Sequence, residues 1–293
     1  MAPGNTQSVL LLPMLSSAII GTLPPTEFEK VTREWRLNQE AALKRDRGWL
    51  SVAGLFWLDE GENSFGSDSV SKIRLPDGPP VAGSFTRRGK EVFLESPAEG
   101  VNVNNSVPTT AALSSDSAGR LDSIRVGRLE MNVIQRGDRV GIRLYDSLAE
   151  SRTKFKGRAW FPADEKWVVR AKFVPYNPPK TVSILNVLGD RSTVPVPGYV
   201  EFKRDGKTLR LDAQGDQNGL FLNFQDASSG KQSYPAGRFL DTPGPRNGFV
   251  EIDFNRSVNP PCAFTAFATC PLPPPGNRLS IPVLAGEKTH HPG

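Results

Sequence analysis

The sequence predicts a mainly β protein, built from antiparallel β-sandwich or β-barrel units with one N-terminal α-helix. Short segments that alternate between apolar and polar residues recur along most of the 293 residues, and such segments are typical of strands. Gly, Pro, Asn and Asp separate them in place of helical crossovers, which favours antiparallel sheets. Only residues 26–47 have the apolar spacing of a long helix.

The helix prediction rests on its N-terminal signals and on one apolar stripe. Thr26 is a favourable N-cap, and Glu29 three residues later completes a capping box. Gly48 offers a left-handed end to the helix. We expect the stripe to pack against a sheet. Its members are Phe28, Val31, Trp35 and Ala42.

The remaining elements are short strands. The clearest hairpin is GYVEFKRDGKTLRLDA, residues 198–213, in which Asp205-Gly206 separates two alternating arms and is typical of a tight primed turn. Further strands are expected at 73–75, 91–95, 129–146, 167–176, 219–226, 237–241 and 248–255.

These elements divide the chain into three parts. Residues 1–25 are expected to be a leader or a disordered segment. Residues 26–175 would form the helix and a β-sandwich-like unit. Residues 181–288 would form a second β unit with a Pro-rich strap, and PYNPPK (175–180) would be the linker.

The strap is the stretch from Asn259 to Leu279, which contains NPP and PLPPP. Prolines keep their preceding residues extended, so this segment loses little entropy when it is ordered. We expect it to lie buried over the C-terminal sheet, with AFTAF (263–267) as its anchor. It then either plugs an open end of the β unit or also forms the wall of a pocket.

Composition restricts the partners. The formal net charge is +5 and the pI about 9.3, but the basic residues are scattered and are not interleaved with aromatics, so no nucleic-acid partner is expected. No segment has the length of a membrane span. We therefore expect a soluble, cytoplasmic protein with a small-molecule ligand, or a secreted one if residues 1–18 are a cleaved signal; the oligomeric state is left open.

The absence of histidine before residue 290 excludes several kinds of chemistry. Ser-His-Asp and Cys-His catalysis lack their usual base, and a zinc site lacks its ligands. No phosphate-binding glycine loop occurs. No metal or cofactor is therefore expected, and the two cysteines are interpreted as buried thiols, with a disulfide as the alternative.

Carboxylates, arginines, a tyrosine and the thiols remain as candidates for a site. In a strand, Glu251, Asp253 and Asn255 would share one face, with Arg256 at its end, and such a cluster can hold a polar ligand; an ordinary solvent-facing edge strand is the alternative. The catalytic candidates are Glu201, Tyr234 and Asp253. The ligand-binding candidates are Arg238, Asn255, Arg256, Asn259, Cys262 and Cys270.

The sequence predicts a small-molecule enzyme of unknown reaction, with a carboxylate as base and an arginine as anion clamp in a pocket of the C-terminal unit. A non-catalytic binding protein with the same pocket is an almost equal alternative. A protein-interaction module that presents the polyproline run is a weaker one.

Two long stretches resemble the signature segments of a family that is catalogued only as a domain of unknown function. They are GWLSVAGLFWLDEGENSFGSDSVSKIRLP (48–76) and NPPCAFTAFATCPLPPPGNRL (259–279), and GRAWFP, PGYVEF and AGRFLD fit the same pattern. The likeness covers about residues 27–288 and implies domain limits but no activity. Phe267 stands where the family pattern has Tyr, and Pro235 where it has Gly, so a proton-transfer role for a hydroxyl at 267 is lost.

FGSDSVSKIRL (65–75) also resembles the early strands of a forkhead-associated β-sandwich. That family binds phosphothreonine through an Arg after the Gly and a later Ser-x-x-His. Ser67 follows Gly66 here, and no histidine precedes residue 290. The resemblance therefore supports a sandwich topology and argues against phosphopeptide binding.

Overall fold

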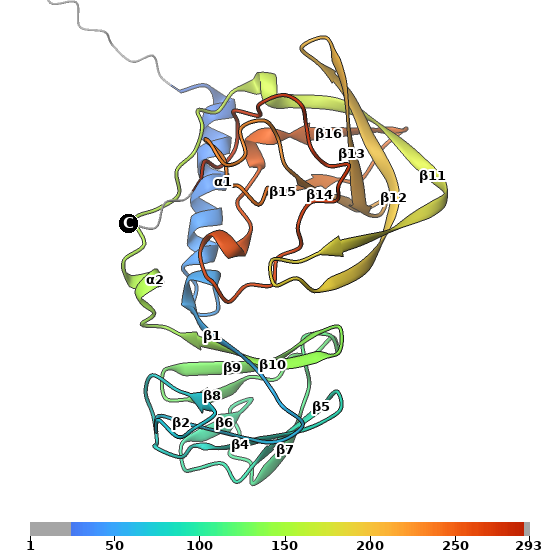
Figure 1. Cartoon of the computed structure of the whole chain (residues 1–293). Helices are drawn as coiled ribbons and strands as arrows, with labels where there is room; N and C mark the ends of the chain where they lie inside the picture. The colour runs from blue at the N-terminus through green and yellow to red at the C-terminus, as the bar shows by residue number, and fades with distance from the viewer. Residues whose placement is uncertain (1–24, 290–293) are drawn as a thin grey trace, which may run out of the picture.

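Two β units are stacked one above the other, and one long helix runs along the side of the upper unit (Figure 1). The computed structural model describes residues 25–289. Of the predicted leader at 1–25 only Pro25 is among them, and both histidines lie outside the described residues. The mainly β, antiparallel fold with a long N-terminal helix is confirmed.

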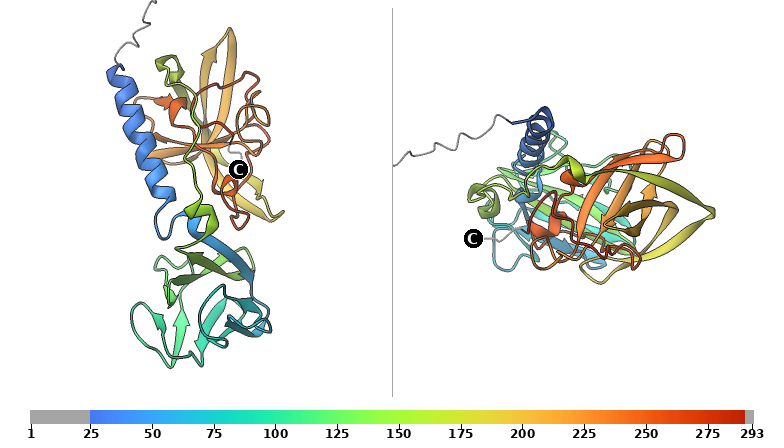
Figure 2. Two further views of the ribbon diagram at one scale, coloured as in Figure 1. Left: turned by 90° about the vertical axis from the view of Figure 1, so that its left-hand side faces the viewer. Right: turned by 90° about the horizontal axis from the view of Figure 1, so that it is seen from above.

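Helix α1 (Glu27–Leu43) begins as its sequence predicts. The Thr26 hydroxyl accepts from the Glu29 N–H at 3.2 Å, and the Glu29 carboxylate accepts from the Thr26 N–H at 2.7 Å, which is the capping box. Figure 2 shows α1 lying along the outside of the upper unit, with its C-terminal end directed towards the lower one.

The end of α1 and its buried face differ from the prediction. The helix ends at Leu43, and Gly48 has a φ of −75°. Glycine is needed there because an added Cβ would lie 2.2 Å from the Leu43 carbonyl oxygen. Thr32 is buried, whereas Val31 from the predicted stripe is 46% exposed. Polar and aromatic side chains therefore share the packing face.

The lower unit is a β-sandwich of two five-stranded sheets. Their orders are β1-β10-β9-β8-β6 and β3-β2-β4-β5-β7, antiparallel except for the short β2–β3 pair. One apolar cluster fills the space between them, and Phe65 stacks on Phe85 at 4.5 Å within it. The strands are β1 (Val52–Trp57), β2 (Gly61–Gly66), β3 (Ile73–Arg74), β4 (Gly83–Arg88), β5 (Glu91–Glu95), β6 (Val101–Val103), β7 (Thr110–Leu113), β8 (Ile124–Val126), β9 (Leu129–Arg136) and β10 (Arg139–Asp146).

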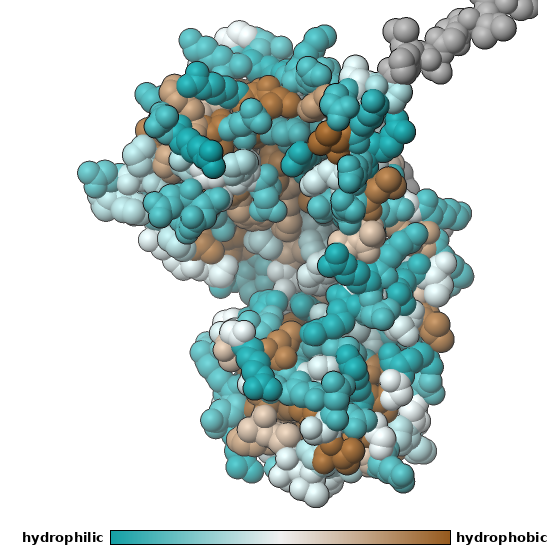
Figure 3. Space-filling view, turned by 180° about the vertical axis from the view of Figure 1, so that it is seen from behind, coloured by the Kyte–Doolittle hydropathy of each residue, from teal (hydrophilic) through white to brown (hydrophobic). Residues whose placement is uncertain are grey.

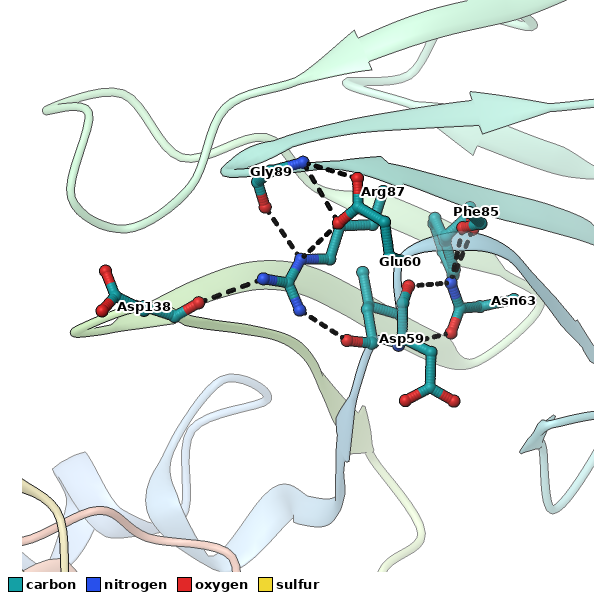
Figure 4. A network of polar contacts seen from close by, with 9 residues as sticks. Asp59, Glu60, Asn63, Phe85, Arg87, Gly89 and Asp138 are labelled. Atoms are coloured by element: carbon teal, nitrogen blue, oxygen red, sulfur yellow. Dashed lines mark hydrogen bonds and ion pairs between the residues drawn. The ribbon is translucent and has the colours of Figure 1, made fainter.

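The LDEGENSFG part of the first signature segment is a turn held together by side chains (Figure 4). The Asn63 amide donates to the carbonyl oxygens of Asp59 and Gly61 at 2.9 and 2.8 Å and to that of Phe85 at 3.2 Å, and its oxygen accepts from the Asp59 N–H. Arg87 ties the same turn to two others through carbonyl oxygens. These polar residues therefore serve the fold of the sandwich.

Replacing Asn63 with alanine should lower the free energy of unfolding by about 2–3 kcal/mol, because it leaves several buried backbone groups without partners. Urea denaturation of the whole chain measures this loss. The matched control is Asn102→Ala, which removes one exposed bond to the Gly100 carbonyl oxygen and should cost about 0.5 kcal/mol or less. Equal losses in the two variants would contradict the structural role of Asn63.

The upper unit is a six-stranded, nearly closed barrel with the order β15-β14-β13-β12-β11-β16. The edge strands β15 and β16 lie close to one another. The Asp205-Gly206 hairpin is confirmed, since both residues have positive φ, at 49° and 73°. The strands are β11 (Val168–Leu185), β12 (Arg191–Arg204), β13 (Lys207–Gly215), β14 (Gly219–Phe224), β15 (Arg238–Pro243) and β16 (Phe249–Asp253).

The linker predicted at 175–180 lies inside β11, so the unit boundary at 175/181 is wrong. Strand β11 pairs with β12 up to Pro175 and again from Lys180, with a register shift between them. The prolines interrupt the ladder, but the flanking residues pair on both sides and keep one strand, which bends as at a bulge. The units are instead joined by residues 147–167, which contain the short helix α2 (Glu150–Thr153).

The strap comes after β16 in the chain and contacts both units: Thr265 and Thr269 bond to Val52 and Arg136 of the sandwich, and Leu272 bonds to Leu185 of the barrel. Its C-terminal continuation fills the barrel, where Leu279, Ile281 and Val283 are core residues. The predicted AFTAF anchor lies elsewhere: Phe264 is buried with Leu43 and Leu50 in a separate cluster, and Phe267 is 36% exposed. Phe264 therefore packs against the end of α1 and the residues that lead into the sandwich, and it is not part of the barrel core. Among the described residues, no helix is both long and apolar enough to cross a membrane.

Candidate functional site

The predicted cluster at the end of β16 is a structural turn. A 3-10 turn begins at Phe254, so strand alternation stops and Asn255 turns inward. Its amide donates to the carbonyl oxygen of Asp164 at 2.9 Å and to the Asp253 carboxylate, and its oxygen accepts from the Asp164 N–H. Arg256 pairs with Asp253 at 3.3 Å. None of Asp253, Asn255 and Arg256 lines either of the two hollows described below.

Glu201 and Arg238 are also separate from the hollows. Glu201 pairs with Arg210 across β12 and β13 at 2.6 Å. Arg238 is fully buried and donates to the Asp226 carboxylate at 2.8 Å and to the carbonyl oxygens of Val283, Ala285 and Glu287. Burial lowers the pKa of Arg238, and Asp226 opposes that shift. Arg238 therefore fastens the strap's continuation to the barrel.

The other four predicted residues are Tyr234 and three members of the strap, Asn259, Cys262 and Cys270. Asn259 is buried, and its N–H donates to the Glu287 carboxylate at 2.7 Å. The Tyr234 hydroxyl donates to the Cys262 carbonyl oxygen at 3.0 Å, and the Cys262 N–H donates to the Cys270 sulfur at 3.2 Å. The structure has both cysteines as free thiols.

Asn259 also lines a hollow of about 630 Å³, which we name the strap pocket. It lies between the end of α1, the sandwich and the strap. Three arginines and no carboxylate are among its lining residues, and the rest are mostly apolar or aromatic. They are Gln39, Ala42, Leu43, Arg45, Arg47, Gly48, Trp49, Tyr145, Arg158, Phe239, Val258, Asn259, Pro261 and Phe264. Seen from behind, the surface is drawn in between the two units (Figure 3).

A buried ion pair adjoins the strap pocket, which Arg158 lines and Glu287 does not. The Arg158 Nη1 is 3.2 Å from the Glu287 Oε2, and the two side chains are 4% and 1% exposed. The Nε of Arg158, the Oε1 of Glu287 and the Oδ1 of Asn259 have no hydrogen-bond partner, and the Nη1 of Arg158 makes only this ion pair. Such buried polar atoms cost free energy, so this cluster is a candidate for completion by a ligand.

Burial controls the ionisation of this pair. It raises the pKa of Glu287 to about 7, against the opposing effects of Arg158, the Asn259 N–H and Arg238. Burial likewise lowers the pKa of Arg158, which Glu287 and Glu40 oppose. A carboxyl group with a pKa near neutrality can take up or release a proton at physiological pH.

A further cation, Arg143, contacts Trp49, one of the aromatic residues that line the pocket. The guanidinium of Arg143, which is buried, lies 4.9 Å from the centre of the Trp49 ring, and its Nε and Nη2 have no hydrogen-bond partner. This placement adds positive potential to the side of the pocket that Trp49 forms.

A second hollow, also about 630 Å³, lies between α1 and residues 158–163. Arg158 lines this helix groove as well. The Trp160 ring lies 4.8 Å from the guanidinium of Arg36 and 5.6 Å from that of Arg158. Glu29 and Glu40 belong to the lining, so the groove has both signs of charge and is less selective for an anion than the strap pocket.

Sequence reasoning did not identify Arg158 or Glu287. Arg158 is part of GRAWFP, which the family resemblance included, but nothing there marks it as a ligand-binding residue. Glu287 follows the proline run by twelve residues. Their pairing is a tertiary contact between residues 129 positions apart, and no local pattern predicts it. Within residues 25–289, no three His, Cys, Asp or Glu side chains are arranged to hold a metal ion.

Comparisons with known proteins find similarity to a family of unknown function and to an uncharacterized protein. The model of a family described as "Protein of unknown function (DUF1684)" matches residues 153–288, which include Arg158, Glu287 and both thiols. A solution NMR structure of an uncharacterized protein from Haloarcula marismortui is 31% identical, and the match covers 47% of this chain and 79% of that one, with a TM-score of 0.39. No curated protein matches the chain.

Proposed function

Since residues 153–288 match a family described only as proteins of unknown function (DUF1684), we propose the function of the chain from the geometry of the strap pocket. The protein binds a small anionic molecule there, and Arg158 is the group that holds the anion. This keeps the arginine clamp expected from the sequence but assigns it to Arg158 in place of the candidates Arg238 and Arg256.

The observation that carries the proposal is the state of Arg158. Its guanidinium is almost fully buried and lines the pocket; its Nε has no hydrogen-bond partner, and its Nη1 makes only the 3.2 Å ion pair with Glu287. A planar guanidinium presents paired donors that match a carboxylate or phosphate. An anion in the pocket would accept from the Nε of Arg158, would share the Nη1 with Glu287, and would meet Arg45 and Arg47, which also line the pocket.

The rest of the lining defines the class of ligand. Trp49, Tyr145 and Phe264 offer apolar and aromatic surface, and few polar groups accompany the arginines. A pocket of this size and composition suits a carboxylate or phosphate that is attached to an apolar or ring-shaped body.

The test screens small carboxylates and phosphate esters by thermal shift and measures the hits by calorimetry on the folded protein. Arg158→Gln should weaken binding of every hit by about a hundredfold, because a buried charged contact is lost. The matched control is Arg256→Gln, an arginine outside both hollows, which should bind like wild type. Hits that bind equally well to Arg158→Gln would overturn the proposal.

Affinity for a carboxylate ligand should depend on pH. A bound anion beside Glu287 raises the pKa of that carboxyl further, so binding takes up a proton once the pH exceeds about 7. Affinity should therefore fall as pH rises, by about tenfold between pH 6 and pH 8. The groups that face Glu287 are Arg158, Arg238 and the Asn259 N–H. Calorimetry of the Glu287→Gln variant should give an affinity that does not change with pH. If the affinity of that variant fell with pH as steeply as that of wild type, this linkage to Glu287 would be contradicted.

A catalytic role is the second candidate, favoured by the ionisation of Glu287. Its pKa of about 7 and its free Oε1 suit a general acid or base, and it lies directly behind Asn259 in the pocket wall. Incubating each hit with the protein tests this candidate. Turnover that the Glu287→Gln substitution abolishes would support an enzyme. If every ligand is recovered unchanged, the result supports a binding protein without catalytic activity.

The proposal retains the expected cytoplasmic location and the expected absence of a nucleic-acid partner. Two neighbouring free thiols favour a reducing compartment. Cell fractionation with an antibody against the chain tests the location, and recovery from the culture medium would support the secreted alternative.

A further inference from the structure

The two thiols are held next to one another by contacts from three parts of the chain. The Cys262 N–H donates to the Cys270 sulfur at 3.2 Å. The Cys262 carbonyl oxygen accepts from the Tyr234 hydroxyl, and the Cys270 carbonyl oxygen accepts from the Val187 N–H at 2.9 Å. Both ends of the loop that joins the thiols are therefore fixed to the barrel.

The two sulfurs differ in access. Cys270 is buried, whereas Cys262 is half-buried, so Cys262 is the more exposed residue of the two. Two thiols that only fill a core would both be enclosed and would need no polar contacts. An accessible thiol with a second thiol directly behind it is instead the arrangement in which the first is oxidised and the second resolves the product.

We propose that Cys262 and Cys270 form a reversible dithiol site that reacts with hydroperoxides, with Cys262 as the attacking sulfur and Cys270 as the resolving sulfur. This inference does not depend on the ligand of the strap pocket.

The chemistry balances in two steps. The Cys262 thiolate attacks one oxygen of ROOH; an S–O bond forms, the O–O bond breaks, and the departing alkoxide takes a proton to give ROH and Cys262 sulfenic acid. The Cys270 sulfur then attacks the Cys262 sulfur, the disulfide forms, and the hydroxyl leaves as water. The sum is two thiols and ROOH giving one disulfide, ROH and H₂O, so the peroxide is reduced by two electrons and the thiols are oxidised.

The pKa shifts of the two thiols agree with Cys262 as the attacking sulfur and Cys270 as the resolving sulfur. The hydrogen bond from Cys270 lowers the pKa of Cys262 to about 7, and Tyr234 adds to the effect. The same contact and burial raise the pKa of Cys270. A thiol with this pKa is about half ionised at pH 7, and after its lower intrinsic nucleophilicity is included it should react roughly fivefold faster than an ordinary thiol.

The experiment uses the full chain, fully reduced, treated with hydrogen peroxide or cumene hydroperoxide. Intact mass should show the loss of two hydrogens, and peptide mapping should join Cys262 to Cys270. At pH 7 thiol loss should be roughly fivefold faster than for free glutathione, and the rate should rise with pH to a plateau above about 7. A thiol reductant should restore the original mass.

Variants separate the two roles. Cys270→Ser should gain one oxygen at Cys262 that dimedone traps, and Cys262→Ser should be nearly inert because only the buried thiol remains. Tyr234→Phe should shift the plateau to higher pH. The proposal would be overturned if the wild-type protein gained oxygens without forming the disulfide, or if it reacted no faster than glutathione. Both measurements use the wild-type protein, so they do not depend on the folding of any variant.

Discussion

Arg238→Met is expected to lower the free energy of unfolding by about 3–5 kcal/mol, because it removes one partner of a fully buried ion pair. Arg238 and Asp226 are both inaccessible to solvent, 2.8 Å apart. The substitution leaves the Asp226 charge without its partner and frees three carbonyl oxygens of the strap's continuation. Urea denaturation of the whole chain measures the loss, and failure to fold counts as the same result.

Two further variants test the cause. Arg256→Met replaces an exposed arginine at the end of β16 and should change stability by about 0.5 kcal/mol or less. Asp226→Asn in the Arg238→Met background removes the buried charge and should recover part of the loss. A loss below about 1 kcal/mol for Arg238→Met would show that the pair does not hold the strap to the barrel.

The second large effect is a pH-dependent difference between wild type and Glu287→Gln. The pKa of Glu287 is about 7 in the folded protein against an ordinary value of 4.5. Between these values the folded chain holds a proton that the unfolded chain has released. The stability that the raised pKa of Glu287 gives the folded protein is therefore fully present below pH 4.5 and is lost as the pH rises towards 7. Wild type should lose about 3 kcal/mol relative to Glu287→Gln over this window.

Denaturation curves at several pH values check this expectation. Glu99→Gln, which removes an exposed carboxylate, should follow wild type across the same range. A constant difference between wild type and Glu287→Gln from pH 4.5 to pH 7 would mean that the carboxyl group stays ionised beside Arg158. In that case the proton uptake proposed for anion binding would also be wrong.

Local signals predicted the elements well. The capping box at Thr26 and Glu29, the primed turn at Asp205-Gly206 and the alternating arms around it all appear where the sequence places them. These features depend on contacts within a few residues, so they can be inferred from the sequence. The prolines at 175–179 were misinterpreted, because a bulge inside a long strand and a linker share the same composition.

The candidate site was only partly predictable. The strap residues Asn259, Cys262 and Cys270 do lie close to one another, but Asp253, Asn255 and Arg256 form a turn away from both hollows. The prediction extended strand alternation one turn too far, since the 3-10 turn Phe254–Arg256 follows β16 directly. Arg158 was not predicted as a site residue, because the sequence does not distinguish a buried arginine from one on the surface.

The sequence by itself determined the class of fold, the position of α1, most strands and the stiffness of the strap, because periodicity, caps and proline act locally. Only the tertiary structure decided which polar groups are buried together. Arg158 meets Glu287, and Arg238 meets Asp226, only after the strap has contacted both units and its continuation has entered the barrel. The physical reason is that desolvation and pairing depend on the packed surroundings of a side chain, and residues far apart in the chain supply those surroundings.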